Sequence, residues 1–305
     1  MFQQPKGDGS NDVYSQLVDA GNDVYGFEPI ELPELPSGER LVIAEQDAPL
    51  PRICDVDDDD DDEAIIRALQ YYVDACEDDD NTGVGGELWP AAAFLCRWLR
   101  DAAAAELSGS SVVELGAGTG ACGVYAAALG ASRTWLTDAF SDSLSLCEVN
   151  AAANAPLFRD RTSRVDVERL AWGDTLPASV TSAEAIDLVI GSDLTYMHEA
   201  HAELAQTLRD LLDLGGSGEV ASMRPPRIVL SHEHRSRDHG LPWLKTDVTL
   251  ESWDAGDPHL ALFQAAAAKQ GLVLAPLVCQ RPRSTMRAGL RSWSADVSVF
   301  EVRRG

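Results

Sequence analysis

The sequence predicts a doubly wound α/β fold with a seven-strand, mostly parallel sheet. The first observation is an apolar strand that runs directly into a glycine-rich turn at 112–121. The second is an alternation of short apolar segments with helical stretches, which is typical of parallel sheets whose crossovers are helices. The third is a pair of closing strands near the C-terminus, at 272–278 and 295–303. We therefore expect a ligand site at the carboxyl ends of the parallel strands.

Each element has its own signal in the sequence. The strands are expected at 112–115, 133–137, 165–172, 187–192 and 227–232, with helices at 89–100 and 258–270 among those between or around them. Pro90 suits a first helical turn, where its missing N–H is no loss. Asp257 and Pro258 form a favourable cap and first turn for the later helix, and Gly271 is a favourable end. Upstream, Glu39–Ala44 is predicted to be a strand.

The glycine-rich turn points to a nucleoside-bearing cofactor. Gly116, Gly118 and Gly120 alternate with other residues, and glycines tolerate positive φ and close approach of a ligand. A dinucleotide fingerprint fits only in the weaker form that ends in alanine, whereas Glu114 completes the pattern E-x-G-x-G-x-G. This pattern favours S-adenosylmethionine, and Glu114 would either hold the backbone of the turn or face the positive charge of that cofactor. Asp138 ends the next strand, where an acid accepts hydrogen bonds from ribose hydroxyls.

Five segments, in this order, carry a family resemblance. They are Gly86–Ala92, Glu114–Gly120, Leu136–Asp138, Leu170–Asp174 and Ile190–Tyr196. On these segments the chain resembles methyltransferase family 16, a group of seven-strand, Rossmann-like protein methyltransferases, many of which modify lysine. The resemblance runs from about Gly86 to the C-terminus. It also implies a small hairpin around the predicted strand at 39–44.

The resemblance implies a role for each matching residue. The cofactor-binding set would be Trp89, Glu114, Gly116, Ala117, Gly118, Gly120, Asp138, Trp172 and Ser192. Within it, Trp89 would close over the cofactor, Asp138 would take the ribose and Trp172 would lie beside the adenine. Asp193 and Tyr196 form the D-x-x-Y signature and would be the catalytic pair that binds and aims the incoming amine.

The same residues have structural alternatives when the family is set aside. Tryptophans are often core residues, which applies to Trp89 and Trp172. Asp138 and Asp193 are each placed to cap a following helix. Tyr196 would simply pack its ring and hydrogen-bond its hydroxyl group.

The chain divides by charge into an acidic extension, 1–86, and a methyltransferase domain, 87–305. Residues 1–88 hold 24 acidic and 4 basic side chains, whereas residues 89–305 hold 26 and 20. The acidic runs Asp57–Glu63 and Asp78–Asp80 are expected to be solvated loops, since like charges repel. Between them, apolar residues from Ile65 to Cys76 recur at helical spacing and predict an amphipathic helix. The first ~30 residues are expected to be flexible, as termini usually are.

The acidic balance disfavours nucleic acid as the direct substrate, because phosphate binding needs basic residues. It suits a basic protein partner, although acidic runs also serve as solubilising segments. No apolar stretch is long enough to span a bilayer, and no signal peptide follows Met1. The six cysteines show no C-x-x-C pairing, so we expect reduced thiols in a cytoplasmic or nuclear protein that acts as a monomer.

A histidine cluster follows the fifth strand. His232 and His234 lie on one side of a strand end, with Glu233 between them and His239 beyond. No third ligand is visible at a fixed spacing, so we expect no metal and place the pair at the lip of the substrate pocket.

Together, the glycine turn and the family resemblance predict an S-adenosylmethionine-dependent protein-lysine methyltransferase. The alternatives are a histidine, an N-terminal amine or a small molecule as acceptor, and a non-enzymatic adaptor that binds a basic partner.

Overall fold

The computed structural model describes most of the domain that the sequence predicts. The described residues are 32–45, 85–160, 162–183, 185–214, 224–234, 257–280, 286–288, 291–293 and 297–305. The acidic runs, the amphipathic helix between them and His239 lie outside these residues, so those predictions are untested.

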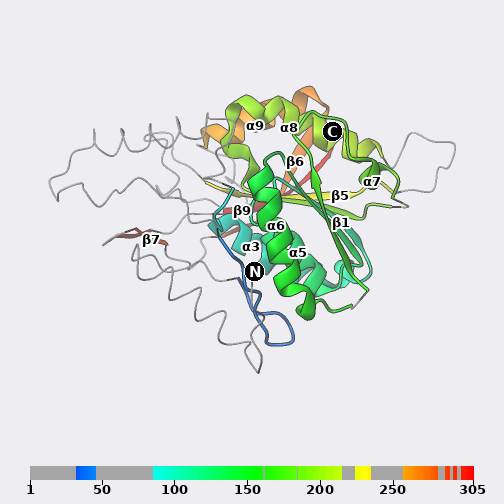
Figure 1. Ribbon diagram of the computed structural model, residues 1–305. Helices are drawn as coiled ribbons and strands as arrows, with labels where there is room; N and C mark the ends of the chain where they lie inside the picture. Colours follow the sequence, from blue (N-terminus) through cyan, green and yellow to red (C-terminus); the bar gives the residue numbers. More distant parts are fainter. Residues whose placement is uncertain are drawn as a thin grey trace.

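A mixed seven-stranded sheet forms the centre of the domain (Figure 1). Its order is β3-β2-β1-β4-β5-β9-β6. The strands are β1 (Ser111–Leu115), β2 (Arg133–Asp138), β3 (Arg164–Arg169), β4 (Leu188–Ser192), β5 (Arg227–Glu233), β6 (Leu272–Gln280) and β9 (Val297–Arg304). Strands β1 to β5 pair in parallel, whereas β9 is antiparallel to both β5 and β6. The predicted doubly wound sheet with a closing antiparallel pair is confirmed.

Helices cover both faces of this sheet (Figure 1). The helices are α3 (Pro90–Trp98), α4 (Ala104–Leu107), α5 (Ala121–Leu129), α6 (Ser141–Asn154), α7 (Ala178–Thr181), α8 (His201–Asp213) and α9 (Pro258–Lys269). One apolar core packs α3 and α5 against the sheet, and a second packs α8 and α9 against the opposite face. A small separate ladder pairs β7 (Met286–Ala288) with β8 (Arg291–Trp293). No helix among the described residues is long and apolar enough to cross a membrane.

Two predicted boundaries differ from the structure. The third strand was expected to reach residue 172 but ends at Arg169, because Ala171 and Asp174 close a turn by a backbone hydrogen bond. The helix expected at 89–100 continues beyond residue 100, through a π-helical turn at Leu99–Ala103 into α4. The predicted cap is confirmed, since the Asp257 carboxylate accepts the amides of the first turn of α9.

The strand predicted at Glu39–Ala44 is wrong, because asparagine side chains take the place of a neighbouring strand. Asn154 accepts a hydrogen bond from the Val42 amide (2.9 Å) and donates one to the Val42 carbonyl (2.7 Å). Asn150, one turn earlier on α6, pairs with Ala44 in the same way (2.7 and 3.0 Å). Alternate residues of this segment are therefore fixed to a helix and need no sheet partner.

We predict that Asn154→Ala lowers the free energy of unfolding by about 1–2 kcal/mol, since the partly buried Val42 backbone loses both partners. Urea denaturation measures this loss. Glu148→Ala, at an exposed position on the same helix, is the matched control and should change stability by less than about 0.5 kcal/mol. Equal losses in the two variants would show that the Asn154 pairing does not stabilise the fold.

Candidate active site

The glycine turn after β1 has the predicted backbone conformation. Gly116 and Gly118 have φ values of 54° and 53°. A Cβ on Gly116 would lie 2.7 Å from Leu194 Cδ2 and 3.1 Å from Trp172 Cζ2, and one on Gly118 would lie 2.7 Å from the Gly85 carbonyl oxygen. Side chains at these positions are therefore excluded by crowding as well as by φ.

Gly120 serves the packing of α5. It is the N-cap residue, with φ of 75°, and a Cβ on it would lie 3.0 Å from Leu136 Cδ1 and 3.1 Å from Cys147 Sγ. Both neighbours belong to the apolar core, so the space beside Gly120 is filled by core side chains. Gly123 was not singled out from the sequence, yet a Cβ there would lie 2.2 Å from Leu136 Cδ2. It allows the helix to approach the sheet closely, the role of the last glycine in dinucleotide-binding turns.

Glu114 holds the first turn of α5, directly after the glycine turn. Its Oε2 atom accepts the Gly123 amide at 2.7 Å, and only 1% of the residue is exposed. Because Gly120 has no side chain to cap α5, this carboxyl group from β1 supplies the missing acceptor for its first turn. Burial raises the pKa of Glu114 to about 8, although the hydrogen bonds from Gly123 and Cys122 oppose the rise.

Asp138 connects the glycine turn to the end of β2. Its Oδ2 atom accepts the Gly118 amide at 2.9 Å, and its Oδ1 atom accepts the Phe140 amide, just before α6, at 3.1 Å. Burial raises the pKa of Asp138, and these amide bonds oppose the rise. Each carboxylate oxygen offers about two acceptor positions, so capacity is left for ribose hydroxyls.

These two carboxyl groups decide which kind of ligand the turn can bind. A dinucleotide places its pyrophosphate on the amides at the helix N-terminus. Here Glu114 takes the Gly123 amide and Asp138 takes the Gly118 amide. With these amides occupied, a cofactor without phosphate that offers ribose hydroxyls to Asp138 fits better than a pyrophosphate, so the residues present fit S-adenosylmethionine.

The other predicted cofactor residues lie at nearby places in the fold. Trp172 packs against Gly116, and Ala117 donates its amide to the carbonyl of Thr137 on β2. Ser192 ends β4 beside the thiol of Cys122 at the start of α5. Trp89 is the half-buried N-cap residue of α3.

The D-x-x-Y turn lies at the end of β4. Asp193 has φ of 54° and is the only residue other than glycine with positive φ among those described. Its carboxylate accepts the Glu233 amide from β5 at 3.2 Å, and its own amide bonds to Ser231. A left-handed aspartate is uncommon and persists where surrounding contacts fix it, as at many active sites. Between it and Tyr196 lies Leu194, whose side chain contacts the glycine turn, so the two halves of the site adjoin.

His232 and His234 do not form a pocket lip, and that prediction is wrong. The two residues are 0% and 1% exposed. Their place on β5 carries them inwards because β9 and α9 cover that end of the strand. Thr195, which the sequence did not single out, bonds through its hydroxyl to His232 Nδ1 at 2.6 Å. No sequence signal marks this residue beyond its position inside D-x-x-Y.

Comparisons with known proteins show the family to which the chain belongs. A protein-family model described as lysine methyltransferase matches residues 70–237. The chain belongs to this lysine methyltransferase family. The Protein N-lysine methyltransferase METTL21A of Xenopus tropicalis is 34% identical over 189 residues, which are 61% of this chain and 79% of that protein. The EEF1A lysine methyltransferase 3 of the same species is 34% identical over 134 residues, 43% of this chain and 54% of its own.

A solved structure that aligns with this chain carries a related ligand. The magnesium protoporphyrin IX methyltransferase of Synechocystis, with bound SAH, covers 70% of this chain and 82% of its own at 16% identity and a TM-score of 0.42. As a member of the lysine methyltransferase family, this chain uses S-adenosylmethionine as its methyl donor, as the glycine turn predicted.

We predict that the stability contributed by Glu114 falls as the pH rises. Its pKa is about 8 in the folded chain, against about 4.3 when unfolded. Between these values the folded chain binds the proton and the unfolded chain does not, so the free energy of unfolding decreases from pH ~5 to pH ~8. Glu114→Gln removes this titration. The free energy of unfolding of the variant, measured in urea, should therefore rise relative to that of the wild type as the pH increases.

Glu148→Gln is the control for this experiment, because Glu148 is exposed on α6. Its pH profile should run parallel to that of the wild type. A Glu114→Gln profile that also runs parallel would show that Glu114 is ionised throughout the range.

Proposed function

We propose that this chain methylates a lysine side chain on a basic protein partner, through the site formed by the glycine turn and the D-x-x-Y turn. The observation that carries the proposal is the contact between these turns, with Leu194 and Trp172 packed against Gly116. A donor on the glycine turn and an amine at Asp193 would then meet at the carboxyl edge of the sheet, where doubly wound folds bind their ligands.

The donor half would use residues whose positions are already constrained. Asp138 would accept the ribose hydroxyls, Trp172 would lie beside the adenine, and Gly116 to Gly118 would line the methionine end. Trp89 and Ser192 would complete the enclosure from α3 and β4. When bound, S-adenosylmethionine supplies an electrophilic methyl group on a positively charged sulfur.

The acceptor half must present a neutral amine in line with that methyl group. A lysine ammonium has a reference pKa of about 10.4, so it must release its proton to water before transfer. The neutral amine would then form a bond to the methyl carbon as the bond from that carbon to sulfur breaks. Asp193 would bind the incoming ammonium group, and Tyr196 would orient it. Because the Asp193 carboxylate is held by the Glu233 amide, the amine would meet a fixed partner, and positioning would supply most of the catalysis.

The charge of the chain supports the class of partner, since the acidic runs at 57–63 and 78–80 suit a basic protein. The cysteines, which show no C-x-x-C spacing, favour the cytoplasm or nucleus, where the chain would act as a monomer. Other amines, including histidine and N-terminal acceptors, are outcomes that a survey of labelled products would reveal. A non-enzymatic adaptor would give no labelled product at all.

Isothermal calorimetry tests the donor. We predict that S-adenosylmethionine binds and that NAD gives no heat, because the turn amides are already taken. Asp138→Ala should weaken donor binding by about 1.5–3 kcal/mol, the range for hydrogen bonds to charged groups. Asp142→Ala, an exposed charge on α6, should leave the affinity unchanged. Preferential binding of NAD would contradict the donor assignment.

Kinetics separate binding from chemistry. Asp193→Asn keeps a residue that tolerates positive φ and can still accept the Glu233 amide, but it removes the charge. We predict that it binds the donor normally and loses about 10²-fold or more in turnover, as for a misplaced reacting group. Tyr196→Phe should also be slow. Glu199→Gln, an exposed carboxylate nearby, is the control. Normal turnover in both test variants would assign the D-x-x-Y turn a structural role.

The acidic run tests the partner class. Changing Asp57 to Asp62 into asparagines removes charge without shortening the chain. We predict a raised KM for a basic protein acceptor at low salt and unchanged donor affinity. At about 1 M salt the two forms should converge, because the Debye length shrinks from ~10 Å at 0.1 M to ~3 Å. An unchanged KM at low salt would mean that the run only solubilises the chain.

A further inference from the structure

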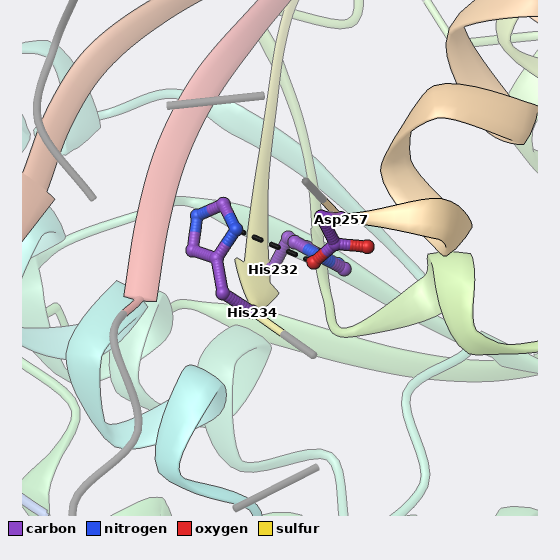
Figure 2. A group of neighbouring side chains, drawn as sticks. All are labelled: His232, His234 and Asp257. Carbon is purple, nitrogen blue, oxygen red and sulfur yellow. Dashed lines mark hydrogen bonds and ion pairs between the residues drawn. The ribbon is translucent and has the colours of Figure 1, made fainter. Parts of the chain in front are cut away.

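The end of β5 buries two imidazole rings against one carboxylate. His232 and His234 are alternate residues of the strand end, and Figure 2 shows both rings facing Asp257, which precedes α9. His232 Nε2 lies 2.7 Å from Asp257 Oδ2, and His234 Nδ1 lies 3.3 Å from the same oxygen. All three residues are at most 1% exposed.

The two oxygens of Asp257 have separate partners. Oδ1 accepts the amides of His259 (2.9 Å) and Leu260 (3.0 Å) and so caps α9. Oδ2 is turned towards the two rings. The cap fixes the orientation of the carboxylate, and the second oxygen is presented to both imidazoles at once.

Hydroxyl groups fix the far side of each ring. His232 Nδ1 bonds to Thr195 Oγ1, and His234 Nε2 bonds to Ser298 Oγ, both at 2.6 Å. Metal-binding histidines in proteins are oriented in this way, by a hydrogen bond at the nitrogen that does not bind the metal.

The hydrogen bonds of Ser298 indicate which nitrogen of His234 carries its proton. The Ser298 hydroxyl donates to Cys279 Sγ at 3.0 Å, so it accepts from His234 Nε2–H. In a neutral ring, Nδ1 then presents a lone pair to the Asp257 oxygen. Two facing lone pairs in a buried site repel each other unless a proton or a metal ion lies between them.

We propose that His232 Nε2, His234 Nδ1 and Asp257 Oδ2 bind a divalent transition-metal ion, with zinc as the first choice. These donor atoms all lie within 4.8 Å of one another. Imidazole nitrogens and a carboxylate suit zinc and its neighbours rather than calcium or magnesium, which prefer oxygen alone.

The two pairs that include Asp257 have spacings close to those around such an ion, while the two histidine nitrogens lie within 4.8 Å of each other. Tetrahedral zinc with bonds of about 2.0–2.1 Å separates its ligand atoms by roughly 3.3 Å. The His234–Asp257 pair already has this separation, and the His232–Asp257 pair would open by roughly 0.6 Å. The metal would join β5 to α9 and fix His232, which supports Thr195 inside the D-x-x-Y turn.

Metal analysis of the full-length chain tests the site without donor or acceptor, so its result is independent of the proposed function. We expect about one zinc ion per chain after chelation and reloading, and a thermal midpoint that rises with zinc. Cobalt substitution should give the absorption of a site with nitrogen and oxygen ligands. His198→Asn, which removes an exposed histidine outside the cluster, should bind zinc like the wild type.

Three variants address the cluster. Asp257→Asn keeps an acceptor for the helix cap but loses the charge, and His234→Gln removes one nitrogen ligand; both should abolish the zinc-dependent rise. Ser298→Ala leaves all three ligands and removes one orienting hydroxyl, so it should weaken zinc binding by about 10–100-fold even if the other variants fail to fold. The proposal is overturned if the wild type takes up no zinc, if Ser298→Ala and a folded Asp257→Asn bind it unchanged, or if His198→Asn loses it.

Discussion

The hydrogen bond from the Gly123 amide to Glu114 is the contact on which the donor half of the site depends. It holds the first turn of α5 against β1, and Gly123 permits the approach because it has no Cβ to meet Leu136. The turn between strand and helix must then close within a few residues, which its glycines allow. A helix N-terminus that usually binds phosphate is instead filled by the protein's own carboxyl group.

The sheet order turns this local constraint into an active site. Strands β2 and β3 continue from β1 on one side, while β4 and β5 lie on the other. The strand order reverses between β1 and β4, so the turns that follow these two strands adjoin at the carboxyl edge of the sheet. Leu194 connects them, because it belongs to the turn after β4 and packs against Gly116 after β1.

The acceptor half is supported from β5 and α9 rather than from β1. Asp193 holds its strained backbone through the Ser231 carbonyl and the Glu233 amide. Thr195 bonds to His232, and the His259 ring bonds to the Tyr196 carbonyl at 3.1 Å. A change at His232 would therefore reach the D-x-x-Y turn through its bond to Thr195. A change at Asp257 would reach the same turn through His259, whose amide Asp257 accepts, without contact with either substrate.

The sequence by itself determined the strand and glycine turn at 112–121, the succession of five parallel strands along the chain and the family. Alternation, glycine spacing and helix caps are local signals, so the Asp257 cap and the positive φ of the turn glycines could be predicted residue by residue. Tertiary structure decided which distant groups meet. Asn154 replaces a strand for Val42, which lies 112 residues away, and Asp257 is the third member of a cluster whose two histidines are 25 and 23 residues earlier in the chain. Such contacts follow from how β5, β9 and α9 pack together, and hydrophobic periodicity carries no information on the partner of a buried polar side chain.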